Sequence, residues 1–189
     1  MWLDPIPPAL RANAAAALDH GDAIGFLTCG RNAHGLELVH FNISELKANG
    51  IYEEALIYAF TAPCVNNHRW PLSALRHLFE AADRVRLRSA GDPLPGRGPF
   101  TLYRGVAGRG TTRRVRGLSW TADLHRARWF AQRFCKPDPA VFRVVVAEAD
   151  VLAYCNDRNE REFLVMLPST AQPMRICEPS PVATSSCRT

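Results

Sequence analysis

The sequence predicts an α+β fold in which a helical N-terminal half precedes a set of short strands. Apolar residues in the first part of the chain recur at helical spacing, most clearly in 72–82, where they fall on one stripe. Glycine and proline, which interrupt helices and strands, are concentrated in 91–99, and short apolar runs typical of strands follow this segment. A chain of 189 residues suffices for one ordinary domain and is marginal for two. We therefore expect one compact unit.

Local signals predict each element of the N-terminal half. Proline at the first turn and a glycine at the end favour a helix over 9–20. Apolar residues in 35–41 favour a short strand, and Ser44 is a plausible cap for the turn that follows. Helices are expected over 51–60 and 72–82. These features indicate packing rather than chemistry, so 1–90 is predicted to be a helical region.

The second half is predicted to alternate strands with one helix. Residues 91–178 carry these core elements, and the polar residues 179–189 are expected to form a flexible tail. Thr121 is the expected cap of the helix, and the run 141–147 is apolar enough for a strand buried on both faces. The expected elements are strands over 100–104, 113–119, 141–147 and 162–167, and a helix over 122–134.

Bulk properties exclude several classes of protein. Hydrophobic residues make up 47% of the chain and charged residues 22%, which is typical of a globular protein and not of a disordered one. No apolar run approaches the ~20 residues of a membrane span, and the start of the chain lacks a signal peptide. The six cysteines form no C-x-x-C pair and no zinc spacing, which favours free thiols over disulfides. We expect a cytoplasmic protein without metal or membrane partner, or one delivered into another cell without a cleaved signal.

Two carboxylates stand two residues apart at the head of an apolar run. Side chains at i and i+2 of a strand share a face, so Glu160 and Glu162 would point into one site while Arg161 points away. Carboxylates stabilise a cationic transition state, as at the anomeric carbon of a sugar. In the alternative, Glu160 is solvated in a loop and only Glu162 lies inside.

Two further motifs lie upstream of these carboxylates. Arg104 follows a short apolar strand, and its guanidinium is suited to phosphate. Gly105 permits close approach of a ligand to the backbone. Ser119 and Thr121 would share one strand face, with Trp120 on the other. Each motif also has a purely structural explanation. Arg104 could pair with a surface acid, and Thr121 could be only the cap of a helix.

Together these motifs resemble the mono-ADP-ribosyltransferases of the arginine–serine–glutamate class, which include many bacterial toxins and effectors. The resemblance covers about residues 99–168 and rests on Tyr103-Arg104-Gly105, on Ser119-Trp120-Thr121 with Ala127 and Trp129-Phe130-Ala131 after it, and on Glu160-Arg161-Glu162. It implies two roughly perpendicular β-sheets that grip NAD, the substrate, in a cleft. Trp120 departs from the family pattern, which more often has a small residue there.

The resemblance also implies a role for each matching residue. Arg104 would bind the phosphate and ribose of NAD, the Gly105 backbone would meet the nicotinamide amide, and Ser119 would orient Glu162. Glu162 would hold the nicotinamide ribose and favour loss of nicotinamide, and Glu160 would engage the acceptor. The remaining implied NAD contacts are Tyr103, Thr121 and Phe130, although an aromatic residue such as Phe130 on a helix is more often core.

The acceptor is expected to be a macromolecule, with protein arginine favoured because a glutamate at the place of Glu160 often accompanies arginine acceptors in this class. The segment 153–159 would be the loop that recognises the target, with Tyr154 as a contact. Arginines cluster between 84 and 116, so a nucleic-acid acceptor and a non-catalytic basic binding module stay open. The resemblance further implies a neutralising immunity or antitoxin partner.

Overall fold

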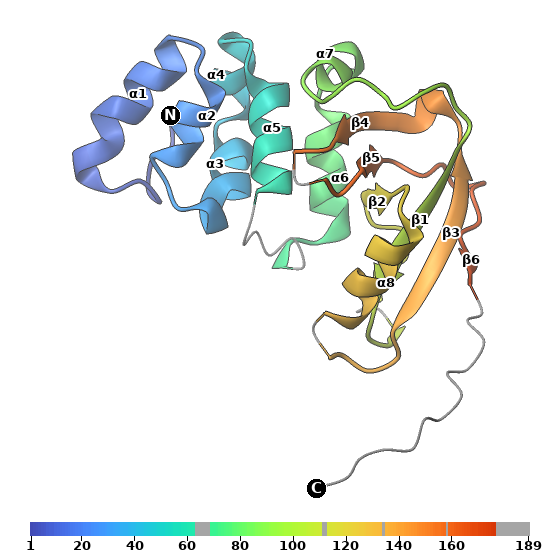
Figure 1. Cartoon of the computed structure of the whole chain (residues 1–189). Coiled ribbons are helices and arrows are strands. Elements are labelled where there is room, and N and C mark those ends of the chain that lie inside the picture. Colours follow the sequence, from blue (N-terminus) through green and yellow to red (C-terminus); the bar gives the residue numbers. More distant parts are fainter. Residues whose placement is uncertain (63–68, 111–112, 134, 158, 177–189) are drawn as a thin grey trace, which may run out of the picture.

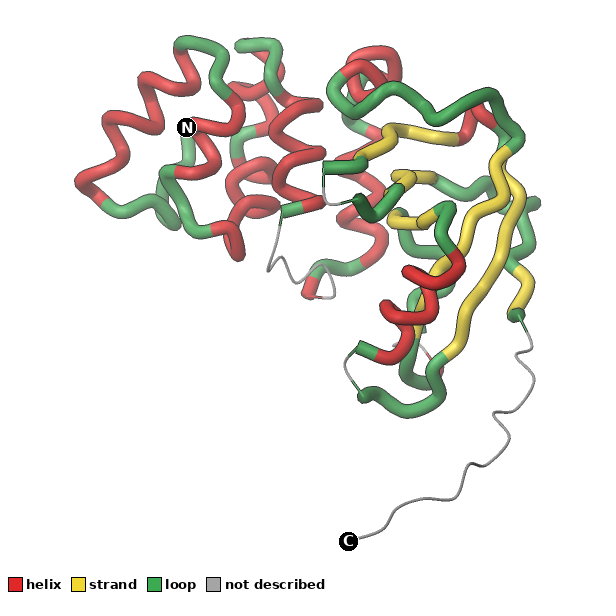
Figure 2. The backbone as a smooth tube through the Cα atoms, viewed as in Figure 1, coloured by secondary structure: helices red, strands yellow, loops and turns green. Residues whose placement is uncertain are grey.

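The computed structural model describes residues 1–62, 69–110, 113–133, 135–157 and 159–176, and its fold belongs to the predicted α+β class. Helices occupy the first half of the chain and the strands the second, with one further helix among the strands (Figures 1 and 2). The expected tail 179–189 lies outside the described residues.

Seven α-helices build the described part of the N-terminal half. Two of them have side-chain N-caps: Asp22 and Asp83 accept hydrogen bonds from the backbone N–H groups in the first turns of α2 and α7. A third, α4, is followed by Gly50, whose positive φ of 73° is typical of a residue that ends a helix. The helices are α1 Arg11–Asp19, α2 Ala23–Thr28, α3 Gly35–Phe41, α4 Ile43–Ala48, α5 Tyr52–Thr61, α6 Leu72–Glu80 and α7 Arg84–Ser89, with short 3₁₀ turns at Pro8–Leu10 and Asn32–His34.

Three features of this half differ from the prediction. The segment 35–41 is helix α3 and not a strand, because its apolar side chains are buried on several sides of one helix, and Gly35 lies against α5 at Ala59. Ser44 lies inside α4 and does not cap it. The short helices α2 and α7 were missed, since six residues carry too little periodicity to detect.

The strands of the second half form one antiparallel sheet among the described residues, where two sheets were expected. Its order is β4-β5-β2-β1-β3-β6, so the three motif-bearing strands β1, β2 and β5 are neighbours. The strands are β1 Phe100–Val106, β2 Ser119–Thr121, β3 Ala140–Val146, β4 Val151–Cys155, β5 Glu162–Val165 and β6 Met174–Arg175; helix α8 spans Leu124–Gln132, and a 3₁₀ turn spans Glu148–Asp150.

The second half of the chain departs from its prediction in four places. Of the predicted strand 113–119, only Ser119 lies in a strand, as the first residue of β2. The segment before it is held by Arg116, which donates to the carbonyl oxygens of Leu167, Pro168 and Ala171. Strand β3 is not buried on both faces, because Arg143 and Val145 are exposed. Strands β4 and β6 were not predicted. Asp123, and not Thr121, caps α8 by accepting hydrogen bonds from His125 N and Arg126 N.

The two faces of the sheet pack into different clusters. Leu164 of β5 and Ala153 of β4 lie in a core shared with the N-terminal helices, whereas Phe163 and Trp120 lie in a separate core on the opposite face. In that second core the ring of Phe163 lies 5.0 Å from the ring of Phe100, although β2 separates β5 from β1 in the sheet. The sheet therefore curls over this core, and in Figure 1 β4 runs across the direction of β1 and β3.

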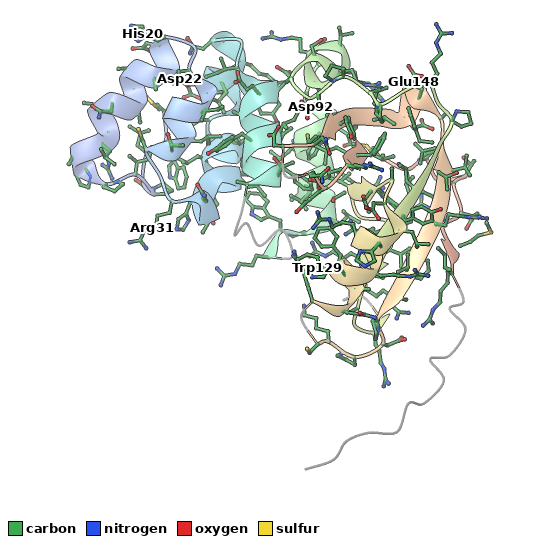
Figure 3. The ribbon with its side chains drawn as sticks, in the orientation of Figure 1. His20, Asp22, Arg31, Asp92, Trp129 and Glu148 are labelled. Carbon is green, nitrogen blue, oxygen red and sulfur yellow. The ribbon has the colours of Figure 1, made fainter. Side chains whose placement is uncertain are left out.

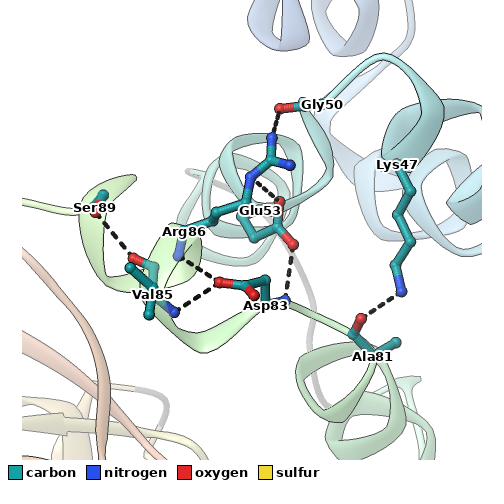
Figure 4. A network of polar contacts seen from close by, with 8 residues as sticks. All are labelled: Lys47, Gly50, Glu53, Ala81, Asp83, Val85, Arg86 and Ser89. Carbon is teal, nitrogen blue, oxygen red and sulfur yellow. Dashed lines mark hydrogen bonds and ion pairs between the residues drawn. The ribbon is translucent and has the colours of Figure 1, made fainter.

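A polar junction joins α4, α5 and α7 (Figure 4). The buried carboxylate of Glu53 accepts a hydrogen bond from Asp83 N at 2.9 Å and lies 3.5 Å from Arg86 Nε. Arg86 also donates to the carbonyl oxygen of Gly50. On the other side of α7, Arg84 and Arg88 donate to carbonyl oxygens of the segment 148–151. Helix α7 therefore connects the N-terminal helices to the β4 edge of the sheet.

Candidate active site

A cleft of about 200 Å³ opens on the sheet face that carries Tyr103, Thr121 and Glu162, which we call the cleft face. Strands β1 and β2 and the start of β5 form its floor. Its walls come from α5 and α6 on one side and from α8 on the other. The cleft lies between these two helical walls.

Strand pairing brings the predicted motifs together on this floor. Tyr103 of β1 lies opposite Thr121 of β2, which in turn lies opposite Glu162 of β5. Paired residues of neighbouring strands share a face, and Ser119 shares it by alternation. Of the predicted site residues, all but Tyr154 line the cleft: Tyr103, Arg104, Gly105, Ser119, Thr121, Phe130, Glu160 and Glu162.

Arg104 stabilises the floor of the cleft by hydrogen bonds to backbone carbonyl oxygens. Its Nε donates to the carbonyl oxygen of Arg114 at 3.0 Å, and its Nη1 donates to the carbonyl oxygen of Ser119. A Cβ atom on Gly117 would lie 2.3 Å from the guanidinium, so a larger residue there would displace the Arg104 side chain. Burial lowers the pKa of Arg104 to about 10, with Glu162 acting in the opposite direction and Arg114 in the same one. The guanidinium is therefore still charged at neutral pH.

Glu160 lies in the loop before β5, because the strand begins only at Glu162. Strand alternation therefore does not place Glu160 and Glu162 on one face, yet both glutamates line the cleft. Thr121 holds the loop in place: its Oγ1 donates to the carbonyl oxygen of Glu160 at 2.7 Å and accepts from Asp123 N at 3.1 Å. Arg161 has a positive φ of 47°, and its N–H donates to Asn156 Oδ1 at 3.1 Å.

Gly105 has a packing role that the sequence did not reveal. A Cβ atom at this position would lie 1.8 Å from the carbonyl oxygen of Ala127 and 2.6 Å from the N atom of Ala131. The backbone of α8 therefore rests directly on β1. This contact fixes the distance between the floor of the cleft and the wall that carries Phe130.

Side chains of both charges line the cleft. Arg114, Arg133 and Lys136 line it together with Arg104, and the two glutamates line it as well. The Arg133 guanidinium lies 4.9 Å from the ring centre of Phe130 and 5.6 Å from that of Trp129. In Figure 3, Trp129 lies on the side of α8 that faces the N-terminal helices. A ligand that complements both the basic side chains and the two glutamates has an anionic part and a part that becomes cationic.

Several cleft residues were missed by sequence reasoning. Phe60, Leu72 and Leu75 form the apolar wall from α5 and α6, and the helical stripe of α6 indicated only core packing for them. Arg133 and Lys136 follow the expected aromatic residues of α8, but nothing in their spacing distinguishes them from surface residues. The apolar wall makes the helical half part of the site.

Tyr154 does not lie in a target-recognition loop. It belongs to β4, is only 6% exposed, and its ring lies 4.8 Å from the ring of Phe163 in the second core. Burial raises the pKa of Tyr154, with the charges of nearby groups as smaller contributions. The predicted loop 153–159 is thus a strand as far as Cys155.

The chain matches none of the family models, curated proteins or solved structures with which it was compared. In the described ranges, no helix has the length and apolar character that crossing a membrane requires. Nor do the described side chains include a group of three or more His, Cys, Asp or Glu residues that could hold a metal ion.

Proposed function

We propose that this protein is an NAD-dependent mono-ADP-ribosyltransferase that modifies a macromolecule, with protein arginine as the favoured acceptor. The observation that carries the proposal is the meeting of the three motifs on one open sheet face: Tyr103 opposite Thr121, Thr121 opposite Glu162, and Ser119 beside them. The curl of the sheet supports the further proposal that its two halves correspond to the two-sheet core of that enzyme class.

The charges of the cleft suit the two ends of the proposed reaction. NAD carries an anionic pyrophosphate, for which Arg114, Arg133 and Lys136 are suitable donors. Its nicotinamide ribose becomes oxocarbenium-like as the bond to nicotinamide breaks, and Glu162 would stabilise that positive charge. The volume of about 200 Å³ is smaller than the ~300–1,000 Å³ typical of whole-ligand pockets. We propose that the cleft takes the nicotinamide and its ribose, and that the pyrophosphate lies at its mouth.

The hydrogen bonds of the clustered arginines favour a protein acceptor over a nucleic acid. Arg84, Arg86, Arg88, Arg104, Arg113 and Arg116 each donate to at least one backbone carbonyl oxygen. These bonds tie segments of the chain together, which accounts for the cluster without a phosphate backbone. A nucleic-acid acceptor is a second candidate, which mass spectrometry of the modified material separates from a protein acceptor.

The test is nicotinamide release from NAD by the purified protein, measured by chromatography. Glu162→Gln keeps the shape of the side chain and removes its charge, so we expect release to fall by about 10²–10³-fold. Glu80→Gln, on the exposed side of α6, is the matched control and should release nicotinamide at the wild-type rate. Release by Glu162→Gln at the wild-type rate, or no release by the wild type, would contradict the proposal.

A further inference from the structure

A second cavity of about 170 Å³ adjoins the cleft and shares Glu160 and Glu162 with it. Its other lining residues come from two places. Tyr58, Thr61 and Ala62 lie at the C-terminal end of α5, and Cys155 and Asp157 lie at the end of β4 and just after it. The two glutamates therefore stand between two cavities, one of which contains the basic side chains and one of which does not.

Transfer of a sugar from NAD constrains where its acceptor can lie. The bond between the ribose C1′ and the nicotinamide nitrogen breaks, and its electron pair leaves with nicotinamide. An acceptor nitrogen that attacks in line forms the new bond at C1′ from the side opposite nicotinamide. If nicotinamide occupies the cleft and its ribose lies at Glu162, the acceptor needs a separate approach to the same carboxylates. The second cavity provides one.

We propose that this second cavity is the acceptor pocket, and that Tyr58 of α5 and Asp157 select a guanidinium side chain for it; this rests on the proposed function. Three carboxylates line the cavity, at Asp157, Glu160 and Glu162. They suit a cation with several N–H donors, and the planar guanidinium of arginine presents five. As its nitrogen attacks C1′ the guanidinium loses one proton, which Glu160 accepts and passes to water.

Two polar groups of the pocket bond to none of the residues that the structure describes. Neither the Tyr58 hydroxyl nor the Asp157 carboxylate has a hydrogen-bond or ion-pair partner among the described residues. Asp157 is exposed and Tyr58 is half-buried, so a side chain arriving from a target protein reaches the carboxylate first. The helical half would therefore contribute to both sites: α5 and α6 to the NAD cleft, and the end of α5 to acceptor selection.

The experiment measures transfer and NAD cleavage separately in the full chain, with agmatine as a small guanidine acceptor and butylamine as an amine without the guanidine group. Asp157→Asn should raise the KM for agmatine about tenfold. Tyr58→Phe should raise it by about threefold. Nicotinamide release without acceptor should stay at the wild-type rate in both variants. Asp19→Asn, an exposed position on α1, is the control and should change neither quantity.

The outcomes separate this inference from the proposed function. Release of nicotinamide with an unchanged KM for agmatine in both variants would overturn the acceptor pocket and leave the enzyme standing. Preference for butylamine over agmatine in the wild type would overturn the guanidinium assignment. Absence of nicotinamide release in the wild type would remove both proposals together.

Discussion

Substitution of Gly105 by alanine tests whether the packing of α8 on β1 sets the width of the cleft. The new Cβ atom would lie 1.8 Å from the carbonyl oxygen of Ala127. Because carbon–oxygen contacts settle at about 3.3–3.6 Å, helix and strand must separate by about 1.5 Å. Overpacking of this kind costs about 1–3 kcal/mol, and the rigid backbone on both sides places Gly105→Ala at the upper end.

The same shift moves the helix wall that carries Phe130 and Arg133. A misplacement of about 1 Å can lower a rate by up to about 10²-fold, so nicotinamide release should fall even where the variant is fully folded. The assays are urea unfolding and nicotinamide release at a temperature well below the unfolding midpoint. Thr101→Ala, an exposed change on the same strand, is the control and should leave both unchanged. Wild-type stability in Gly105→Ala would refute the packing argument, and lower stability with full release would refute its link to the cleft.

Two further predictions concern Arg104 and Tyr52. Arg104→Lys cannot keep the hydrogen bonds to the carbonyl oxygens of both Arg114 and Ser119. It should therefore lower the free energy of unfolding by about 1–3 kcal/mol and reduce nicotinamide release, whereas Arg97→Lys at an exposed position should change neither. An unchanged urea midpoint in Arg104→Lys would contradict the stabilising role of these two hydrogen bonds. Burial raises the pKa of Tyr52, whose hydroxyl donates to the carbonyl oxygen of Leu78 at 2.8 Å. The folded state therefore keeps the proton above about pH 10, where the unfolded chain loses it, so stability is present below that pH and declines as the pH rises. Urea midpoints at about pH 8 and about pH 11 should differ more in the wild type than in Tyr52→Phe, and equal differences would contradict this.

The sequence predicted the fold where its signals were local and strong. The stripe of 72–82 became α6, and the apolar runs at 100–104, 141–147 and 162–167 became β1, β3 and β5. It failed where tertiary contacts decide. The segment 35–41 is a helix because it is buried on several sides, and 113–118 is held in place by Arg116, whose three carbonyl partners lie more than fifty residues away in the chain.

The candidate site shows the same division. Arg104, Ser119 and Glu162 were recognisable because each stands in a short motif at a strand, and antiparallel pairing of neighbouring strands then brings the motifs together. Phe60, Leu72 and Tyr58 were not recognisable, because their helices reach the sheet only through the fold. Tyr154 was misassigned because the family resemblance implied a loop over 153–159, whereas strand β4 continues to Cys155.

The most direct test of the central claim is mass spectrometry of a cell lysate after incubation with the purified protein and NAD, with searches for ADP-ribose on protein and on nucleic acid together. We predict ADP-ribose on arginine side chains of protein, absent when Glu162→Gln replaces the wild type. Adducts confined to nucleic acid would contradict the acceptor. The absence of any adduct, together with intact NAD, would contradict the enzyme and favour a module that only binds.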